Sequence, residues 1–187
     1  ALLSQEDRAQ LMVRAEDDLA PFMEKIAPVV AAVRKEGDAA LVRYARQFDG
    51  AEIDPDSIAA SDAEIDAAYD TLDSDFVDVL RYAADNIKRF HENQVPESQW
   101  MVEIRPGARV GERFTPIDSV ACYSPRGKGS FPSVTLMSVI PAVVAGVEKV
   151  IVLTPPGPDG KIDPATLVAA DIAGTRNIYK AGGAQAV

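Results

Sequence analysis

The sequence contains one histidine, His91, and one cysteine, Cys122, and these two residues limit the chemistry that the chain can do by itself. A metal site of two or three imidazoles cannot be built from one histidine, and a Ser-His-Asp or Cys-His arrangement would have to use His91. His91 ends a charged helix, where a cation is favoured, so we predict an exposed or capping residue. Cys122 alternates with Val120 in an apolar segment, and we predict that it is buried and inert.

Charge and hydropathy exclude several classes of partner. The 187 residues include 19 Lys and Arg against 29 Asp and Glu, a net charge of -10 that disfavours nucleic-acid backbones and anionic membranes. No apolar run approaches the roughly 20 residues that cross a bilayer, and no secretory signal opens the chain. We therefore predict a soluble, cytoplasmic protein that binds neither nucleic acid nor membrane.

Eleven of the acidic residues lie between positions 49 and 80, a stretch without Lys or Arg. One interpretation is a site for a cation or a basic partner. The acids are spaced through a helical pattern, which favours a solvated helix face instead.

Helical spacing dominates the first half of the chain. Ser4 and Asp7 have the spacing of a capping box, Ser61 and Asp38 precede apolar runs as caps, and Phe48-Asp49-Gly50 ends a helix. The apolar face predicted for the longest helix contains Phe76, Leu80, Ala83, Ile87 and Phe90. The predicted helices are 4–20, one from Val29 to Gly37 that follows Pro28, 38–48, one that begins after Ser61, and 74–93.

From Trp100 the apolar period changes to two, which predicts short strands joined by turns, with Trp100 and Met101 in a core or an interface. Strands are then predicted at 119–123, 150–153 and 177–179, separated by helices at 132–145 and 164–173. This alternation predicts an α/β fold with a parallel sheet. Residues 1–117 would form a helix-rich part, and residues 118–187 half of a nucleotide-binding unit.

Ligands of such sheets bind beyond the carboxyl ends of the strands, so the loops 124–130, 154–163 and 181–185 are candidates. In the first loop Gly127 and Gly129 would let backbone N–H groups approach an anion, and Arg126 and Lys128 add positive charge. A dinucleotide pyrophosphate would suit this loop. Because the spacing is not GxGxxG, a plain connecting turn is the alternative.

An ordered series of motifs through most of the chain resembles the histidinol dehydrogenase family. The similarity is densest from residue 113 to residue 187. The motifs are Gly37-Asp38, Phe48-Asp49, Arg113-Phe-Thr-Pro-Ile-Asp118, Tyr123 with the following Pro/Gly loop, Phe131-Pro-Ser133, Leu136-Met137, Ile140-Pro-Ala142, Val144-Ala-Gly-Val147, Thr154-Pro-Pro156 and Ala181-Gly-Gly-Ala-Gln-Ala186.

The resemblance implies a zinc-dependent homodimer with Rossmann-like domains that oxidises L-histidinol to L-histidine in two steps with two NAD molecules. It assigns Tyr123 and Gln185 to NAD. The family's zinc ligands and its Glu-His catalytic pair correspond to positions beyond Val187, so we expect no catalytic or metal-binding residue in this chain. The chain would be the N-terminal part of such an enzyme, inactive alone, with residues 118–187 as the first half of its NAD-binding domain.

One segment departs from the family pattern. The family usually has Tyr-Val-Pro-Gly-Gly where this chain has Tyr123-Ser-Pro-Arg-Gly-Lys-Gly129. Arg126 could pair with cofactor phosphates, or it could mark a paralogue that oxidises another amino or sulfonated alcohol, as the related sulfopropanediol dehydrogenases do. A non-catalytic module that binds a nucleotide or a partner chain is the third alternative.

Overall fold

The computed structural model describes residues 4–12, 19–127 and 129–187, and its centre is a three-stranded parallel sheet. The strand order is β3-β4-β5, with Val120 of β3 opposite Val150 and Val152 of β4 opposite Ile178. The predicted α/β fold is therefore confirmed. The strands and their following helices are β3 (Ser119–Tyr123), α6 (Pro132–Val144), β4 (Lys149–Thr154), α7 (Pro164–Ala173), β5 (Ile178–Lys180) and α8 (Gly183–Ala186).

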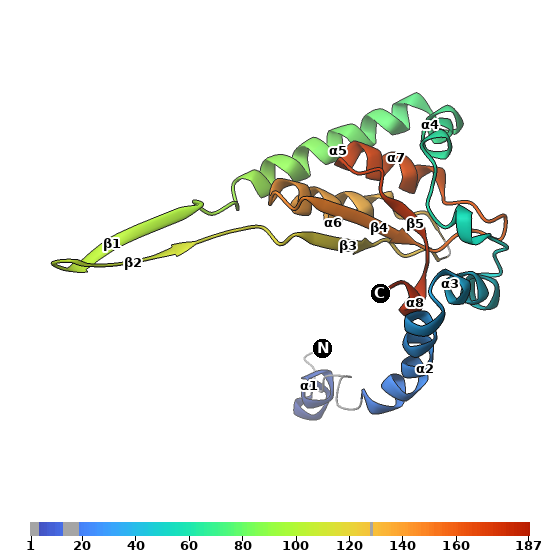
Figure 1. Ribbon diagram of the computed structural model, residues 1–187, viewed down its shortest axis with the longest axis horizontal. Helices are drawn as coiled ribbons and strands as arrows, with labels where there is room; N and C mark the ends of the chain where they lie inside the picture. The colour runs from blue at the N-terminus through green and yellow to red at the C-terminus, as the bar shows by residue number, and fades with distance from the viewer. Residues whose placement is uncertain (1–3, 13–18, 128) are drawn as a thin grey trace.

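Helices make up most of the first half of the described chain (Figure 1). The capping box at Ser4 and Asp7 is formed, and Ser61 accepts a hydrogen bond from the Glu64 N–H as the cap of α4. The elements are α1 (Gln5–Met12), α2 (Ala20–Glu36), α3 (Asp38–Tyr44), the π-helix η1 (Ala45–Asp49), the 3-10 helix η2 (Pro55–Ser57), α4 (Asp62–Thr71) and α5 (Ser74–Glu92).

One predicted helix boundary needs correction, and another lies outside the described residues. The predicted helix 4–20 is described only as α1, because residues 13–18 lie outside the described ranges. The second helix does not start after Pro28; α2 begins at Ala20, with Pro21 in its first turn and Pro28 inside it. Pro21 is tolerated there because the first-turn N–H groups of a helix have no partner within the helix. Gly37, with a φ of 58°, ends α2 as predicted.

The main core lies between the sheet and the helices α4, α5, α6 and α7, which cover one of its faces (Figure 1). Its fully buried side chains include Ile65 of α4, Leu136 of α6, Val152 of β4 and Leu167 of α7. The predicted apolar face of α5 is only partly right. Leu80 is buried, and Ala83 and Ile87 pack against the core, but Phe76 and Phe90 are exposed because the buried stripe runs through Val77, Leu80 and Ala84.

Strands β1 (Gln99–Arg105) and β2 (Ala108–Arg113) form an antiparallel hairpin that extends away from the rest of the molecule (Figure 1). Trp100 and Met101 are 44% and 55% exposed, so the prediction that they belong to a core is wrong. The Trp100 indole N–H donates to Glu112 Oε2 on the opposite strand at 3.1 Å. Their predicted role in an interface stays a prediction.

Most carboxylates of the acidic stretch are exposed, as the predicted solvated face requires, but several of them also pair with cations elsewhere in the chain. Arg176, just before β5, forms ion pairs with Asp62 and Asp66 of α4 and with Asp171 of α7. These pairs join α4 to the sheet layer. The acids of α4 therefore serve partly as attachment points between distant segments.

Tyr69 extends the same network and gives a testable pH dependence. Its hydroxyl donates to Asp171 Oδ2 at 2.7 Å, and burial together with this hydrogen bond raises the pKa of Tyr69 from 10.0 to about 12. We expect Tyr69→Phe to lower the free energy of unfolding by about 1.5 kcal/mol at pH 7, the contribution of a hydrogen bond to a charged group. Since the folded-state pKa is the higher one, this contribution is complete below pH 10 and disappears as the pH rises towards 12.

Urea unfolding at pH 7 and pH 11 measures the difference. Tyr82→Phe is the matched control, because Tyr82 lies on the neighbouring helix α5 with 71% of its surface exposed. A Tyr69→Phe effect of the same size at both pH values would contradict the assignment.

Candidate cofactor site

The carboxyl ends of β3, β4 and β5 meet at one edge of the sheet, where the loops of the candidate site also begin. Tyr123 is the last residue of β3, and Gln185 lies in α8, just after β5. The structure brings these two segments together, because the Gly183 N–H donates a hydrogen bond to the Tyr123 hydroxyl oxygen at 3.2 Å. The two residues predicted for a cofactor therefore belong to one region.

The turn between β5 and α8 depends on both of its glycines. Gly183 has a φ of +59°, in the left-handed region, and a Cβ at this position would lie 2.7 Å from Gln185 Oε1. A Cβ on Gly182 would lie 2.6 Å from the Pro155 side chain. The Gln185 side chain is folded back against the turn and is only 6% exposed. The Gly-Gly pair therefore lets the turn close around Gln185.

Two cavities open at this edge. One, of about 330 Å³, is lined by Gln185 together with Ile151, Leu153, Tyr179 and Asp38, among others. The other, of about 290 Å³, is lined by Asp49, Arg126, Gly127, Pro155, Pro156 and Pro158. Residues of all three candidate loops line the two cavities, so an extended ligand that occupied both would contact each loop.

The loop after β3 is fixed at both ends. Thr135 of α6 donates to the buried Ser124 hydroxyl at 2.9 Å, and Ser130 donates to Asp163 Oδ2 at 2.6 Å. Between them, a Cβ added to Gly127 or Gly129 would approach only the Phe131 ring, at 4.0 and 3.9 Å. The backbone there is open to an approaching group, as the predicted anion loop requires; Lys128 lies outside the described residues.

Arg126 and Asp49 face the smaller cavity together. Within the described ranges, Arg126 makes no hydrogen bond or ion pair, and its guanidinium lies so close to Gly157 that a Cβ there would be 2.6 Å from Nη1. Burial raises the pKa of Asp49, while the positive charge of Arg126 acts in the opposite direction. Asp49 Oδ2 is buried without a hydrogen-bond partner. Sequence reasoning assigned Asp49 no role at the site, although the Phe48-Asp49 motif marked its position.

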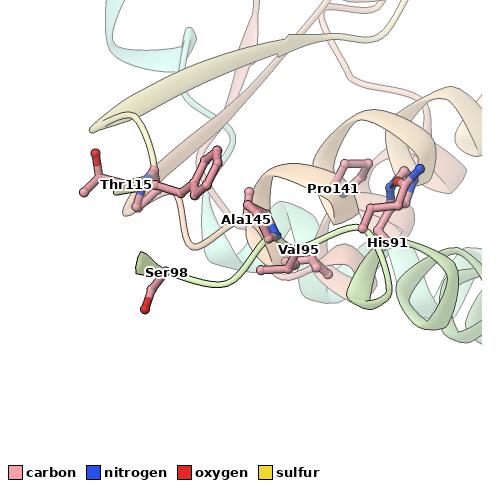
Figure 2. Close-up of a pocket in the computed structure, with 11 residues that line it drawn as sticks. His91, Val95, Ser98, Thr115, Pro141 and Ala145 are labelled. Carbon is pink, nitrogen blue, oxygen red and sulfur yellow. Dashed lines mark hydrogen bonds between the residues drawn. The ribbon is translucent and has the colours of Figure 1, made fainter. Parts of the chain in front are cut away.

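His91 lies far from this edge, at the amino-terminal side of the sheet. It lines an apolar cavity of about 470 Å³ beside the segment that leads into β3 and the end of α6, where Figure 2 shows it next to Pro141, with Thr115 at the other end. Its Nδ1 is 2.6 Å from Gln94 Oε1, three residues further along the chain. His91 is half-buried against this cavity rather than exposed, and its hydrogen bond goes to the Gln94 side chain rather than to a carbonyl of the α5 end, so it is not a cap.

Cys122 is buried as predicted. Its thiol donates to the Ser138 carbonyl oxygen at 3.4 Å, and burial raises the pKa of the thiol. A thiol that stays protonated is a poor nucleophile.

The chain matches the family model for histidinol dehydrogenase over residues 12–187. The chain belongs to the histidinol dehydrogenase family. It is 54% identical over 180 residues to a histidinol dehydrogenase homolog 2 from Mesorhizobium japonicum and 41% identical over 185 residues to a histidinol dehydrogenase from a Synechococcus species. These alignments cover 96% and 98% of this chain but only 41% and 42% of the relatives.

The fold of the chain is also that of a solved histidinol dehydrogenase. The crystal structure of histidinol dehydrogenase from Elizabethkingia anophelis superposes with a TM-score of 0.85 at 32% identity, covering 98% of this chain and 42% of that one. The chain thus spans about two-fifths of the length of these relatives.

The described residues leave backbone and ring surface accessible at this edge of the sheet. The open glycine backbone after β3 and the exposed part of the Tyr123 ring offer surfaces for phosphate and for a flat ring. In the described ranges, no three His, Cys, Asp or Glu side chains converge as metal ligands, so no chemical step is assigned to a metal here. No helix among the described residues is long and apolar enough to cross a membrane.

Proposed function

We propose that this chain forms the NAD-binding half of a dehydrogenase that oxidises L-histidinol to L-histidine in two steps. The observation that carries the proposal is the joining of Tyr123 to the Gly-Gly-Ala-Gln turn at the carboxyl edge of a parallel sheet, in a chain of the histidinol dehydrogenase family. Ligands of such sheets bind at this edge. Histidine biosynthesis would be the process served.

Bound NAD would supply the hydride acceptor for both oxidations, of the alcohol and then of the hydrated aldehyde. The first oxidation releases one proton; the second consumes a water, which supplies the second oxygen of the carboxylate, and releases two protons. In this proposal the chain's own residues bind the NAD molecule and orient it. Tyr123, a residue that is 37% exposed, lies beside the turn, and Gln185 offers an amide at the adjacent cavity. The glycine backbone after β3 leaves room for phosphates.

The proton-accepting base and the zinc ligands are proposed to come from the part of the relatives that this chain does not span. The chain's single imidazole is at the opposite end of the sheet, and its acids do not form a metal donor set among the described residues. We further propose a cytoplasmic homodimer, as the family resemblance implies.

The experiment is a titration of the complete gene product with NAD, followed by variants of the two predicted contacts. We expect Tyr123→Ala and Gln185→Ala each to weaken NAD binding about tenfold, because each removes a contact of roughly 1.4 kcal/mol. Unchanged affinity in both variants would remove the site assignment. A reading frame that ends at Val187, with no downstream histidines or glutamates, would favour a non-catalytic binding module.

A second candidate is a paralogous dehydrogenase of another amino or sulfonated alcohol. Arg126 favours it, because its guanidinium makes no ion pair within the described ranges and lines the site. The relatives named histidinol dehydrogenase homolog are also 50–54% identical to this chain, compared with 41–44% for those named histidinol dehydrogenase. Comparison of kcat/KM for histidinol and for a small hydroxyalkyl sulfonate distinguishes the two candidates.

A further inference from the structure

Lys180 and Glu64 form an ion pair in an unusually dry position. Lys180 Nζ lies 2.9 Å from Glu64 Oε2, and the two side chains are only 8% and 22% exposed. Among the ion pairs of the described residues, no other has both side chains less than a quarter exposed. An apolar pair of similar size usually stabilises a fold at least as well as a buried ion pair. The stability of the fold therefore does not by itself explain why Lys180 and Glu64 are charged residues.

The ion pair lies at the carboxyl end of β5, next to the candidate site. Lys180 is the final residue of β5, and Ala181, Gly182 and Gly183 follow it directly towards Gln185. Strand β5 has only three residues. It pairs with β4 on one side, and on the other it meets the segment around Ala59 in a single bridge. Backbone hydrogen bonds hold the strand as far as Lys180, whose N–H donates to the Ile58 carbonyl oxygen at 2.7 Å. The Lys180 side chain adds an attachment to α4 at the point where the turn begins.

Glu64 provides a firm attachment for that strand end. It lies in the first turn of α4, where its N–H is capped by Ser61, and α4 packs against α7 of the core. The second carboxylate oxygen, Oε1, is buried and has no hydrogen-bond partner. Lys180 is therefore the group that compensates the buried charge of Glu64, and the two side chains have to stay together.

We propose that the Lys180–Glu64 ion pair is a positioning device that fixes the direction in which the 181–185 turn leaves β5, and thereby places Gln185. A charge-assisted hydrogen bond has a defined length and direction, whereas apolar contact does not. The consequence for nucleotide binding rests on the proposed function, because the placement of Gln185 matters through its contact with NAD. The consequence for the turn itself is independent of any cofactor.

The test separates positioning from stability with a double variant. Lys180→Met leaves Glu64 buried and unpaired, so it should lower the urea midpoint. Lys180→Met combined with Glu64→Leu removes both charges and should restore the midpoint. If the pair positions the turn, hydrogen exchange of the 181–186 amides in the 187-residue chain stays about tenfold faster than in the wild type, and the complete gene product binds NAD about tenfold more weakly.

Asp66→Asn is the matched control. Asp66 lies on the same helix as Glu64 and pairs with Arg176, so this variant breaks an ion pair of α4 without touching the turn. Exchange at 181–186 and NAD affinity should both remain unchanged. If the double variant does not fold, Glu64→Gln replaces it, because glutamine keeps the shape of the side chain and removes the charge. This variant should also accelerate hydrogen exchange of the 181–186 amides.

Wild-type exchange at 181–186 in the double variant, or in Glu64→Gln where that variant is needed, would overturn the proposal. Faster exchange with unchanged NAD affinity would support the role of the ion pair in the turn and overturn its consequence for nucleotide binding. A wild-type complete product that fails to bind NAD would refute the proposed function instead, while the exchange result would still decide whether the ion pair holds the turn.

Discussion

The 187-residue chain, incubated with NAD and histidinol, is expected to form NADH at a rate at least about 10²-fold below that of the complete gene product. The reason is that the general base, which alone contributes about 10²–10⁴-fold, is proposed to belong to the part of the relatives that this chain does not span. His91 is the chain's single imidazole, and it is bound to Gln94 beside the amino-terminal side of the sheet. Tyr123 and Gln185 lie at the carboxyl edge. The only imidazole therefore cannot accept a proton from an alcohol held beside those two residues.

Absorbance at 340 nm measures NADH, with the complete gene product as the positive control. His91→Ala in the complete product is the second control, and it should leave kcat unchanged because His91 is outside the proposed site. Steady NADH formation by the 187-residue chain, at the rate of the complete product, would show that the base is present in this half.

Much of the sheet could be predicted from the sequence because its signals are local. Buried parallel strands are continuous apolar runs, and helix 164–173 starts at a proline after the capping Asp163 and ends at Gly174. Those signals placed α7 correctly at both ends. The approach of Tyr123 to the Gly183 turn also followed, because parallel strands deliver their carboxyl ends to the same edge.

Other features depend on how helices and strands pack against each other, and the local sequence does not show this packing. Phe76 and Phe90 have helical spacing with Leu80, but α5 turns a neighbouring stripe through Val77 and Ala84 towards α6 and the core. Pro28 usually argues against a helix interior, yet α2 continues through it.

The charged contacts of α4 were hidden for the same reason. Eleven acids without a nearby cation suggested a solvated face. Their partners Arg176 and Lys180 are more than a hundred residues away in sequence and are brought close only by the crossover that places β5 beside the 58–60 segment. Asp49 at the site was missed similarly, since its cavity partner Arg126 belongs to another loop.

Gly183→Ala is expected to abolish most of the NAD affinity of the complete gene product, with a loss of about 10²-fold, because an ångström-scale displacement of a binding group has effects of that size. Two costs add at this position. Gly183 has a φ of +59°, which costs a residue with a Cβ about 1–2 kcal/mol. The new Cβ would also lie 2.7 Å from Gln185 Oε1, so the amide has to leave its buried place.

Gly107→Ala separates these two costs. Gly107, in the β1–β2 turn, has a φ of +80°, but a Cβ there would meet no atom within 4 Å. It should therefore lower the free energy of unfolding by about 1–2 kcal/mol through backbone strain alone and leave NAD affinity unchanged. Equal losses of NAD affinity in both variants would mean that general destabilisation causes the effect. A large loss in Gly183→Ala alone would show that NAD binding depends on the geometry of this turn, which contacts both the Gln185 amide and the Tyr123 hydroxyl.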